Sequence, residues 1–494
     1  MKPFRAAGGF AALLALAPLS ARPAEPTQNV LTYHADAARS GNFVIPGLTD
    51  ERARAVHPDT GFKASIDGHI YAQPLFWRGP GGNGAGNGLL LVAIESNNVY
   101  ALDGASGKTV WQRALGRPAS RGALPCGNID PLGITGAPAI DAQGAALYLD
   151  AMVQTGTGPS HQLFGLSLRD GSVLPGWPID VAGALRQQGL EFDARNQNER
   201  GALLVMGDSV YVPYGGHYGD CARYHGWVVG AKLAGDHALT SWHVPAQAGG
   251  IWAPAGISSD GTSLYVATGN TMDTRQWAAG EAVIRLPPDL KFSGAPRDYF
   301  APSDWRALDD RDADLGGVAP VEFSAGGMKL VLTLGKDGKA YLMDRGNLGG
   351  IGGALAQAEV SPRAIRTAVA VYPLGDAAAI AFEGAGSSCP AGSAGKGLTV
   401  LKITGKPPAI TTAWCAAVDG RGAPIVTTTD GRSDPIVWML GAEGDDRLYA
   451  FRGDNGEKLF ASAPLKGLRH FETLIATPQR LYIAGDNAVY AFAF

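Results

Sequence analysis

Apolar residues along this chain come in short runs that are separated by turn-forming residues, a pattern that predicts strands and tight turns. The clearest example is residues 98–115, NVYALDGASGKTVWQRAL. An apolar strand at 99–103 precedes a glycine-rich turn, and a second strand carries Trp111. Asp103 can accept hydrogen bonds from turn amides, and Gly107 can take the positive φ that closes the turn. The segment therefore predicts a β-hairpin whose tryptophan packs between two sheets.

A weaker copy of this hairpin, LYAFRGDNGEKLFASA, lies near the C-terminus at 448–463. Aligned on their glycines, the two segments pair Ala101 with Ala450, Gly107 with Gly456, and Trp111 with Phe460. A hairpin that recurs at opposite ends of a chain indicates a repeat architecture.

Apolar runs equivalent to 99–103 recur at spacings that fall from about sixty to about forty residues, close to the range of propeller blades. They are 99–103, 163–168, 227–233, 282–286, 340–344, 398–403, 448–451 and 489–494. Another apolar strand precedes most of them, at 89–93, 146–151, 209–214, 263–268, 329–334, 436–440 and 480–484. Each pair predicts the two middle strands of a four-stranded blade.

The two ends of the chain predict how the ring closes. Residues 489–494 would be the third strand of a last blade, and residues 62–66 can supply its fourth strand. The prediction is an all-β, eight-bladed β-propeller whose last blade is closed by an N-terminal strand, which protects the sheet edges. Seven blades is the alternative, because the region near Leu398 is weakly patterned. Two packed β-domains would need a polar linker, and none is evident.

The predicted organisation is a signal peptide at 1–24, an irregular lead-in at 25–55 and a single propeller domain at 56–494. Lys2 and Arg5 precede an apolar segment at 9–19 that is too short to span a bilayer. Cleavage after Ala21 or Ala24 would give a periplasmic or extracellular protein with no membrane span in the mature chain. The alternative is an uncleaved membrane anchor.

Composition supports many short strands over long helices. The 494 residues include 69 Gly and 32 Pro, and 46% are hydrophobic while only 17% are charged. The net charge of −4 is spread along the chain without a dense Lys/Arg patch, which argues against a nucleic-acid partner.

Four cysteines, Cys126, Cys221, Cys389 and Cys415, fit an oxidising compartment. Cys389 and Cys415 lie within one predicted blade and form a natural pair, which would leave Cys126 with Cys221. Three connectivities are possible, and the sequence does not choose among them. The spacings match neither a CxxC redox motif nor a CxxCH haem motif, so structural disulfides are the preferred interpretation.

The first hairpin resembles the tryptophan-docking motif of quinoprotein-type propellers, A-x-D-x-x-T-G-K-x-x-W. Ala101, Asp103, Gly107, Lys108 and Trp111 match it, with Ser106 in place of Thr. Further segments, among them YHADAARSG, GITGAPAID, GIWAPAG, ATGN and GKDGKAYLMDRGNLGG, resemble secreted bacterial proteins with pyrroloquinoline quinone (PQQ)-like repeats. The resemblance covers nearly the whole mature chain and implies a quinoprotein-like propeller.

The resemblance does not extend to two features that are common in PQQ alcohol dehydrogenases. Many PQQ alcohol dehydrogenases have two adjacent cysteines over the quinone, and many carry or partner with a haem c module. This sequence has neither a Cys-Cys pair nor a CxxCH motif, and its docking motif is intact in one blade only. These departures favour a binding role over a redox role.

The densest acidic segment contains Asp309, Asp310, Asp312 and Asp314. Carboxylates of Asp310, Asp312 and Asp314 on one loop could hold calcium through hard oxygen ligands. One of them could also act as a base beside a quinone. The alternative interpretation, a solvated loop with turn-forming aspartates, is preferred.

Other polar residues are predicted in loops that could project over the central channel. They are the run 193–200, the group His217, Asp220 and His225 around Cys221, and Glu95, Trp252, Asn270, Lys336 and Asp337. A His-Asp-His group could bind a metal, and a ring of such side chains could bind a polar ligand. Turn and loop bracing is the alternative role for all of them.

Two functional hypotheses follow. The preferred one is a non-catalytic binding or scaffold propeller that holds an unknown protein, polymer or small molecule at its channel. The alternative is a divergent PQQ- and calcium-dependent dehydrogenase that oxidises an alcohol or sugar, by proton abstraction and hydride transfer to the quinone.

Overall fold

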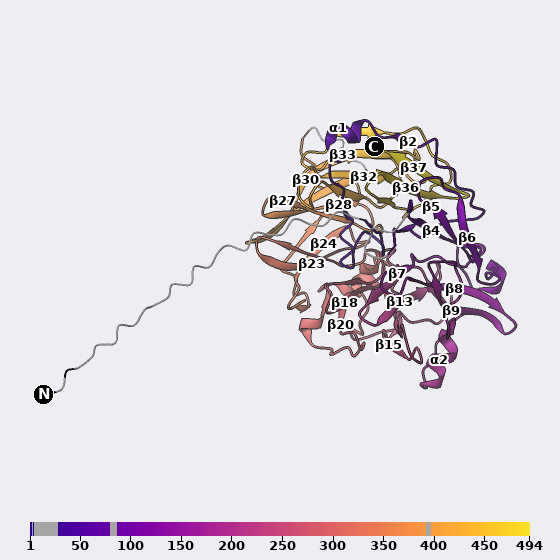
Figure 1. Ribbon diagram of the computed structural model, residues 1–494. Coiled ribbons are helices and arrows are strands. Elements are labelled where there is room, and N and C mark those ends of the chain that lie inside the picture. The colour runs from indigo at the N-terminus through magenta and orange to yellow at the C-terminus, as the bar shows by residue number, and fades with distance from the viewer. Residues whose placement is uncertain (2, 4–27, 80–85, 392–396) are drawn as a thin grey trace.

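Eight blades, each built on four antiparallel strands and three of them carrying one added strand, form a closed ring in the computed structural model, which describes residues 1, 3, 28–79, 86–391 and 397–494 (Figure 1). Within those residues, no helix is long and apolar enough to cross a membrane. The predicted signal peptide lies almost wholly outside the described residues. The fold is therefore the predicted eight-bladed β-propeller, and the seven-bladed alternative is wrong.

The blades follow one another along the chain, each running from an inner strand to an outer one. Blades 1 and 2 are β3 (Leu75–Trp77), β4 (Leu89–Ile94), β5 (Asn98–Asp103), β6 (Thr109–Ala114) and β7 (Ala139–Asp141), β8 (Ala146–Thr155), β9 (Gly158–Ser167), β10 (Ile179–Asp180). Blades 3 and 4 are β12 (Leu204–Met206), β13 (Ser209–Gly216), β14 (Trp227–Lys232), β15 (Leu239–His243) and β17 (Ser258–Ser259), β18 (Leu264–Thr268), β20 (Ala282–Leu286), β21 (Tyr299–Ala301).

Blades 5 and 6 are β22 (Val321–Ala325), β23 (Met328–Leu334), β24 (Lys339–Asp344), β26 (Ala356–Glu359) and β27 (Ala370–Leu374), β28 (Ala377–Glu383), β29 (Gly397–Gly405), β30 (Pro408–Ala417). Blades 7 and 8 are β31 (Ile425–Thr428), β32 (Ile436–Leu440), β33 (Leu448–Arg452), β34 (Lys458–Ala461) and β35 (Leu474–Ala476), β36 (Arg480–Gly485), β37 (Ala488–Ala493), β2 (His57–Pro58). Short additions are β1 (Asn42–Val44), β11 (Gln197–Glu199), β16 (Gln247–Ala248), β19 (Thr271–Met272), β25 (Gly350–Ile351), α1 (Asp50–Arg54), α2 (Val181–Gln187) and α3 (Trp305–Asp309).

The ring closes through an N-terminal strand, as predicted, but through different residues. β2 pairs with β37, so His57 and Pro58 complete blade 8 (Figure 1). The predicted strand at 62–66 is wrong. Phe62 instead packs its buried ring against Tyr482 at a centroid distance of 5.5 Å. Its apolar pattern reflects core packing between blades 8 and 1, not a strand.

Antiparallel order brings two kinds of loop to the same side of the ring. Every inner strand begins at one face, and the turn between the second and third strands returns to that face. We call it the upper face. It therefore collects the loops between blades and the turns such as those at Glu95, Asn270 and Lys336.

Trp111 docks blade 1 on blade 2. Its indole N–H donates to the Leu168 carbonyl at 3.1 Å, and its ring covers Gly171, where a Cβ would lie 2.6 Å from the indole. In the turn before it, the Asp103 carboxylate accepts from the Ser106 amide at 2.8 Å, and Gly107 has φ +73°. The hairpin thus has the turn and the packing predicted for it.

Blade 6 docks on blade 7 by the same device. The Trp414 indole N–H donates to the Gly453 carbonyl at 2.7 Å, and the ring covers Gly456. No docking motif precedes Trp414 in the sequence, so the hairpin alignment missed it.

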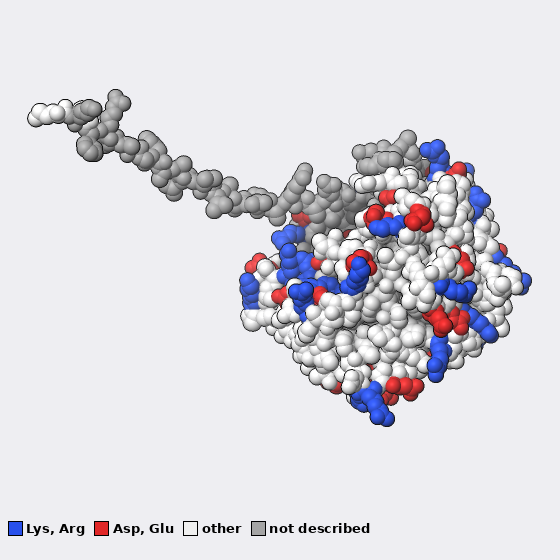
Figure 2. Space-filling model, turned by 90° about the horizontal axis from the view of Figure 1, so that it is seen from below, with Lys and Arg blue, Asp and Glu red and all other residues white. Residues whose placement is uncertain are grey.

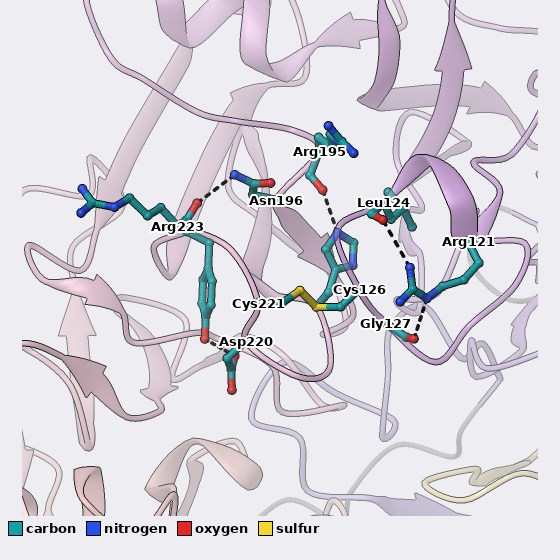
Figure 3. The surroundings of a disulfide bond; sticks show 11 residues. Arg121, Leu124, Cys126, Gly127, Arg195, Asn196, Asp220, Cys221 and Arg223 are labelled. Carbon is teal, nitrogen blue, oxygen red and sulfur yellow. Dashed lines mark hydrogen bonds between the residues drawn. A yellow bond between two sulfur atoms is a disulfide. The ribbon is translucent and has the colours of Figure 1, made fainter.

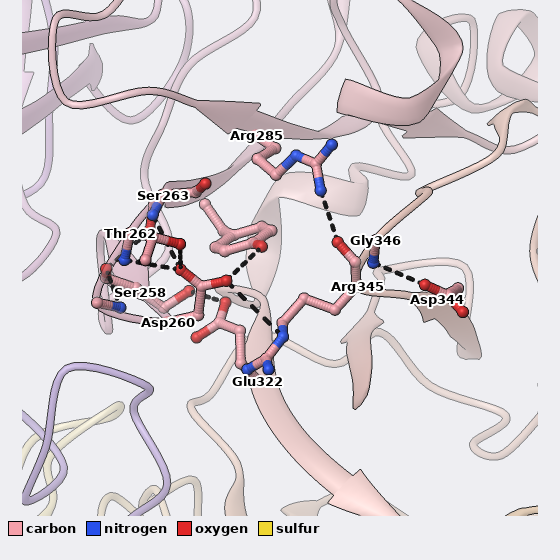
Figure 4. Close-up of polar contacts among 12 residues, drawn as sticks. Ser258, Asp260, Thr262, Ser263, Arg285, Glu322, Asp344, Arg345 and Gly346 are labelled. Carbon is pink, nitrogen blue, oxygen red and sulfur yellow. Dashed lines mark hydrogen bonds and ion pairs between the residues drawn. The ribbon is translucent and has the colours of Figure 1, made fainter. Parts of the chain in front are cut away.

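Polar contacts join blades 4 and 5 (Figure 4). The Asp260 carboxylate accepts from the Thr262 and Ser263 amides and lies 3.7 Å from Arg345 of the next blade. Ser258 donates to Glu322 across the same boundary at 2.7 Å. These contacts order the turns on the side opposite the upper face.

Candidate functional site

The central channel is filled by the N-terminal segment. Val30 bridges Phe76 of β3, and β1 runs parallel to β31, so residues 31–41 form a loop inside the ring. Tyr33 packs there among small side chains that begin the inner strands of blades 2 to 7. They are Ala137, Ala202, Ala253, Ala255, Ala319, Ala368 and Ala423. Alanines leave the width that this loop needs, and we call residues 31–41 the plug.

Buried hydrogen bonds fix the plug to several blades. The Arg39 guanidinium donates to the carbonyls of Ile257 and Leu203, both at 2.9 Å. The His34 ring contacts the Val369 carbonyl at 3.1 Å and the Thr473 hydroxyl at 3.2 Å. Burial lowers the pKa of His34 to about 3, so the ring is neutral at physiological pH. The plug is therefore a permanent part of the core.

Above the plug, a small recess opens at the centre of the upper face. Its walls come from blades 1, 2, 3, 4 and 8, and its lining residues are Tyr33, Tyr71, Gln73, Thr135, Ala137, Arg200, Pro254, His470 and Phe471. The recess measures about 350 Å³ including the part open to solvent, and the centre of a water molecule can reach about 20 Å³ of it. Because the water-accessible part is so small, the recess has room for one functional group only. A pocket for a whole small ligand takes roughly 300–1,000 Å³ of enclosed space.

Arg200 supplies a positive charge to the recess. Its guanidinium lies 4.7 Å from the centre of the Phe471 ring, a cation–π contact. Burial lowers its pKa to about 10, so it stays charged at neutral pH. A second cation, Arg469, donates to the Tyr71 hydroxyl at 2.9 Å and pairs with Asp486.

A buried carboxyl group lies behind the Thr135 wall. Glu95 accepts from the Gly133 amide at 2.7 Å and from the Thr135 hydroxyl at 2.8 Å. Burial raises the pKa of Glu95 to about 7, despite these hydrogen bonds. Burial likewise raises the pKa values of Glu199, Glu281, Glu322, Glu383 and Glu472.

Five residues that the sequence suggested as ligand-binding candidates come together at blades 4 and 5. The Lys336 ammonium lies 2.6 Å from Asp314 and 5.3 Å from the centre of the Trp252 ring. The Asp314 carboxylate also accepts from the Asn270 amide at 3.0 Å. Lys336 contacts Asp312 at 2.8 Å as well. A flat aromatic ring, a cation and buried carboxylate thus form one cluster.

The acidic loop is not arranged as a calcium site. Asp310 is exposed, and Asp312 and Asp314 face the Lys336 ammonium, a cation that already neutralises them. Asp309 accepts from the amide and hydroxyl of Thr271, both at 2.9 Å. Across the described residues, no group of three acidic, His or Cys side chains is placed to hold a metal. The geometry gives the predicted calcium site no support.

The His-Asp-His group around Cys221 is likewise held by separate partners. His217 contacts the Arg195 carbonyl at 2.9 Å, Asp220 accepts from Tyr224 at 2.6 Å, and His225 contacts the Ala246 carbonyl at 2.6 Å. The Cys126–Cys221 disulfide joins this turn to the loop entering blade 2 (Figure 3). The second disulfide is Cys389–Cys415.

The recess itself was missed by sequence reasoning. Tyr71 and the segment 469–471 carry no motif, and their meeting with Arg200 depends on the order of blades 1, 3 and 8. The one usable signal was the concentration of charged and aromatic residues in a loop between blades.

Structural comparison defines the fold. Quinohemoprotein alcohol dehydrogenase from Comamonas testosteroni superposes with a TM-score of 0.63 at 14% identity, over 95% of this chain and 81% of that chain. A europium-containing methanol dehydrogenase gives 0.61 at 14% identity, over 94% and 98%. The chain has the fold of the quinoprotein-type propellers. BamB from Moraxella catarrhalis gives 0.51 at 16% identity, over 89% and 100%. No family model and no curated protein matches the sequence.

The residues of this chain do not fit PQQ and calcium as they are arranged. The recess above Tyr33 has space for a functional group and not for a fused-ring quinone. Lys336 takes the position that a divalent ion would need beside Asp312 and Asp314. The likeness to quinoproteins is therefore a likeness of fold.

Proposed function

We propose that this protein is a non-catalytic binding propeller of the periplasm or extracellular space. It holds a protein, polymer or small molecule at the mouth of its central channel, on the upper face. The two disulfides suit an oxidising compartment. Charged side chains of both signs are interspersed with wide uncharged areas on the face drawn in Figure 2, which is a poor match for a polyanionic partner.

The observation that carries this proposal is the filled channel. The plug occupies the space in which a propeller of this type could enclose a whole ligand, and the Arg39 guanidinium of the plug is bonded to the blades. A larger open hollow is lined by His69, Glu95 and Tyr100. At the channel itself, a shallow recess lined by Arg200, Tyr71 and Phe471 is left. Such a surface can hold one end of a ligand, whereas redox chemistry would need a cofactor enclosed away from water.

The second candidate is a divergent PQQ- and calcium-dependent dehydrogenase acting on an alcohol or sugar. The cluster of Trp252, Asp314 and Lys336 favours it, because a flat ring beside a buried carboxylate is a suitable setting for a quinone. It requires Lys336 to leave the two aspartates before a metal ion can enter.

Calorimetry with PQQ and calcium chloride, combined with dye-linked oxidation of a panel of alcohols and sugars, separates the two candidates. For the binding propeller we expect no saturable heat up to high micromolar PQQ and no dye reduction. A Lys336→Met variant should behave in the same way. Saturable PQQ binding with dye reduction, in the native protein or in this variant, would overturn the proposal.

A further inference from the structure

The recess contains hydrogen-bond donors that have no protein partner. Among the described residues, no Asp or Glu oxygen lies within 4.0 Å of the Arg200 guanidinium, and no hydrogen bond to it is formed. By contrast, the buried Arg39 guanidinium donates to four oxygens within the plug and the neighbouring blades. The Arg200 guanidinium is therefore charged, and its N–H groups have no protein acceptor and can donate to a ligand.

The floor of the recess supplies a second, independent donor. Tyr33 is only 3% exposed, and its hydroxyl has no hydrogen-bond partner among the described residues. A buried hydroxyl without a partner costs roughly 1–3 kcal/mol. The ring is part of the plug and is stacked on His34 at a centroid distance of 4.4 Å, so its hydroxyl is fixed in the buried floor of the recess that Tyr33 lines.

The wall supplies a third group of suitable polarity. The Tyr71 hydroxyl accepts from Arg469 at 2.9 Å, so its own proton remains to be donated. The acidic groups nearby are either paired or have raised pKa values. His470 pairs with Glu443 at 2.6 Å, and burial raises the pKa values of Glu95 and Glu472. The groups that face the recess therefore favour an anionic acceptor.

We infer that the recess binds the carboxylate group of a ligand. The Arg200 guanidinium would donate two hydrogen bonds to it, and the Tyr33 hydroxyl would donate a third from below. The Phe471 ring, over which the guanidinium lies, would fix the orientation of the guanidinium. A planar guanidinium matches a carboxylate with two parallel hydrogen bonds. The limited volume admits a group of this size, and the rest of the ligand must project from the upper face. Phosphate would bring a larger and more highly charged group beside the buried glutamates. This inference rests on the proposed binding function and gives its ligand a chemical class.

The test is calorimetric titration of the native mature protein with benzoate, benzamide, phenyl phosphate and acetate. Benzoate and benzamide have the same shape, but benzamide lacks the charge and has an NH2 donor in place of one acceptor oxygen, while acetate shows whether the group suffices without a ring. We expect benzoate to bind about 10- to 100-fold more tightly than benzamide, the gain typical of a charge-assisted pair of hydrogen bonds. Benzoyl-capped peptides with free and amidated C-termini then distinguish a peptide terminus from a free acid as the source.

Three variants assign the effect. Arg200→Gln should abolish the preference for benzoate over benzamide, and Tyr33→Phe should lower benzoate affinity several-fold. Arg169→Gln removes an exposed arginine elsewhere on the ring and should bind as the native protein does. Near-ultraviolet circular dichroism and thermal unfolding check that each variant keeps the fold.

The outcomes that overturn this inference differ from those that overturn the proposed function. Equal binding of benzoate and benzamide, tighter binding of phenyl phosphate, native affinity in Arg200→Gln, or no acid binding at millimolar concentration would each refute the carboxylate site. PQQ-dependent dye reduction would instead refute the binding propeller. Either result can occur without the other.

Discussion

At the scale of the residue, the strand pattern predicts the position of Glu95 on the upper face. It comes directly after an apolar strand, and strand order alone decides which turns share a face, so its place on the upper face is predictable. The same argument holds for the turns that carry Asn270 and Lys336. The contact of Lys336 with Asp312 and Asp314 is not predictable in this way, because the distances between the ammonium and the two carboxylates depend on how blade 4 packs against blade 5.

The burial of Glu95 predicts a pH-dependent stability. Its folded pKa of about 7 lies above the ordinary value of 4.5, so the folded state holds the proton more tightly than the unfolded state. The contribution is fully present below about pH 4.5 and is lost as the pH rises to about 7. Glu95→Gln keeps the shape and cannot ionise, so we expect it to raise stability at pH 8 by up to roughly 3 kcal/mol.

Urea unfolding of both proteins at pH 4 and pH 8 measures this effect. The difference between them should largely disappear at pH 4. Asp208→Asn, at an exposed carboxylate on the other side of the ring, serves as the control. A gain of the same size at both pH values would contradict the assignment to Glu95 ionisation.

At the scale of the element, the docking hairpin is the unit that joins one blade to the next. The sequence predicted the hairpin of blade 1 because both the turn and the tryptophan are present. It did not predict the role of Trp414, which docks blade 6 on blade 7 in the same way but follows a different turn. Strand β2 was missed for a related reason. His57 and Pro58 are exposed, and an outer edge strand needs neither apolar alternation nor a full set of donors.

Trp111→Ala should destabilise the protein by roughly 3–5 kcal/mol, because it removes a buried ring and leaves a cavity between blades 1 and 2. Chemical denaturation followed by circular dichroism gives the value. Val110→Ala, at a neighbouring side chain that is 55% exposed, should change stability little. If stability held and only ligand binding fell, the docking role of Trp111 would be wrong.

Trp414→Ala should cost a comparable roughly 3–5 kcal/mol, since the indole is 3% exposed and makes the same two contacts with the next blade. The same denaturation measurement applies, with exposed Thr411→Ala in the same strand as its control. A change below about 1 kcal/mol would show that the two hairpins are not equivalent, whatever their geometry.

At the scale of the whole molecule, the fold was predictable because its period is carried by every blade, whereas the contents of the channel were not. The alanines that admit the plug are inconspicuous in the sequence, and nothing in the segment YHADAARSG shows that its His and Arg are buried. The pairing of the cysteines was likewise left open, and the structure selects Cys126–Cys221 and Cys389–Cys415.

The two disulfides should contribute unequally to stability. Cys126–Cys221 spans 95 residues and Cys389–Cys415 spans 26. In the loop-entropy model these separations correspond to about 4.7 and about 3.5 kcal/mol. We therefore expect the double serine variant of the first pair to lower the free energy of unfolding by about 1 kcal/mol more than that of the second. Denaturant unfolding of the two variants compares them, and the reverse order would contradict the model for this ring.

Strands β1 and β2 also constrain the order in which the protein can fold. Both belong to the first part of the chain to be made, yet their partners β31 and β37 lie in blades 7 and 8. These two pairings cannot form until blades 7 and 8 exist, and such distant pairing slows folding. During that wait the open ring exposes two unpaired sheet edges, which makes this the stage most prone to aggregation.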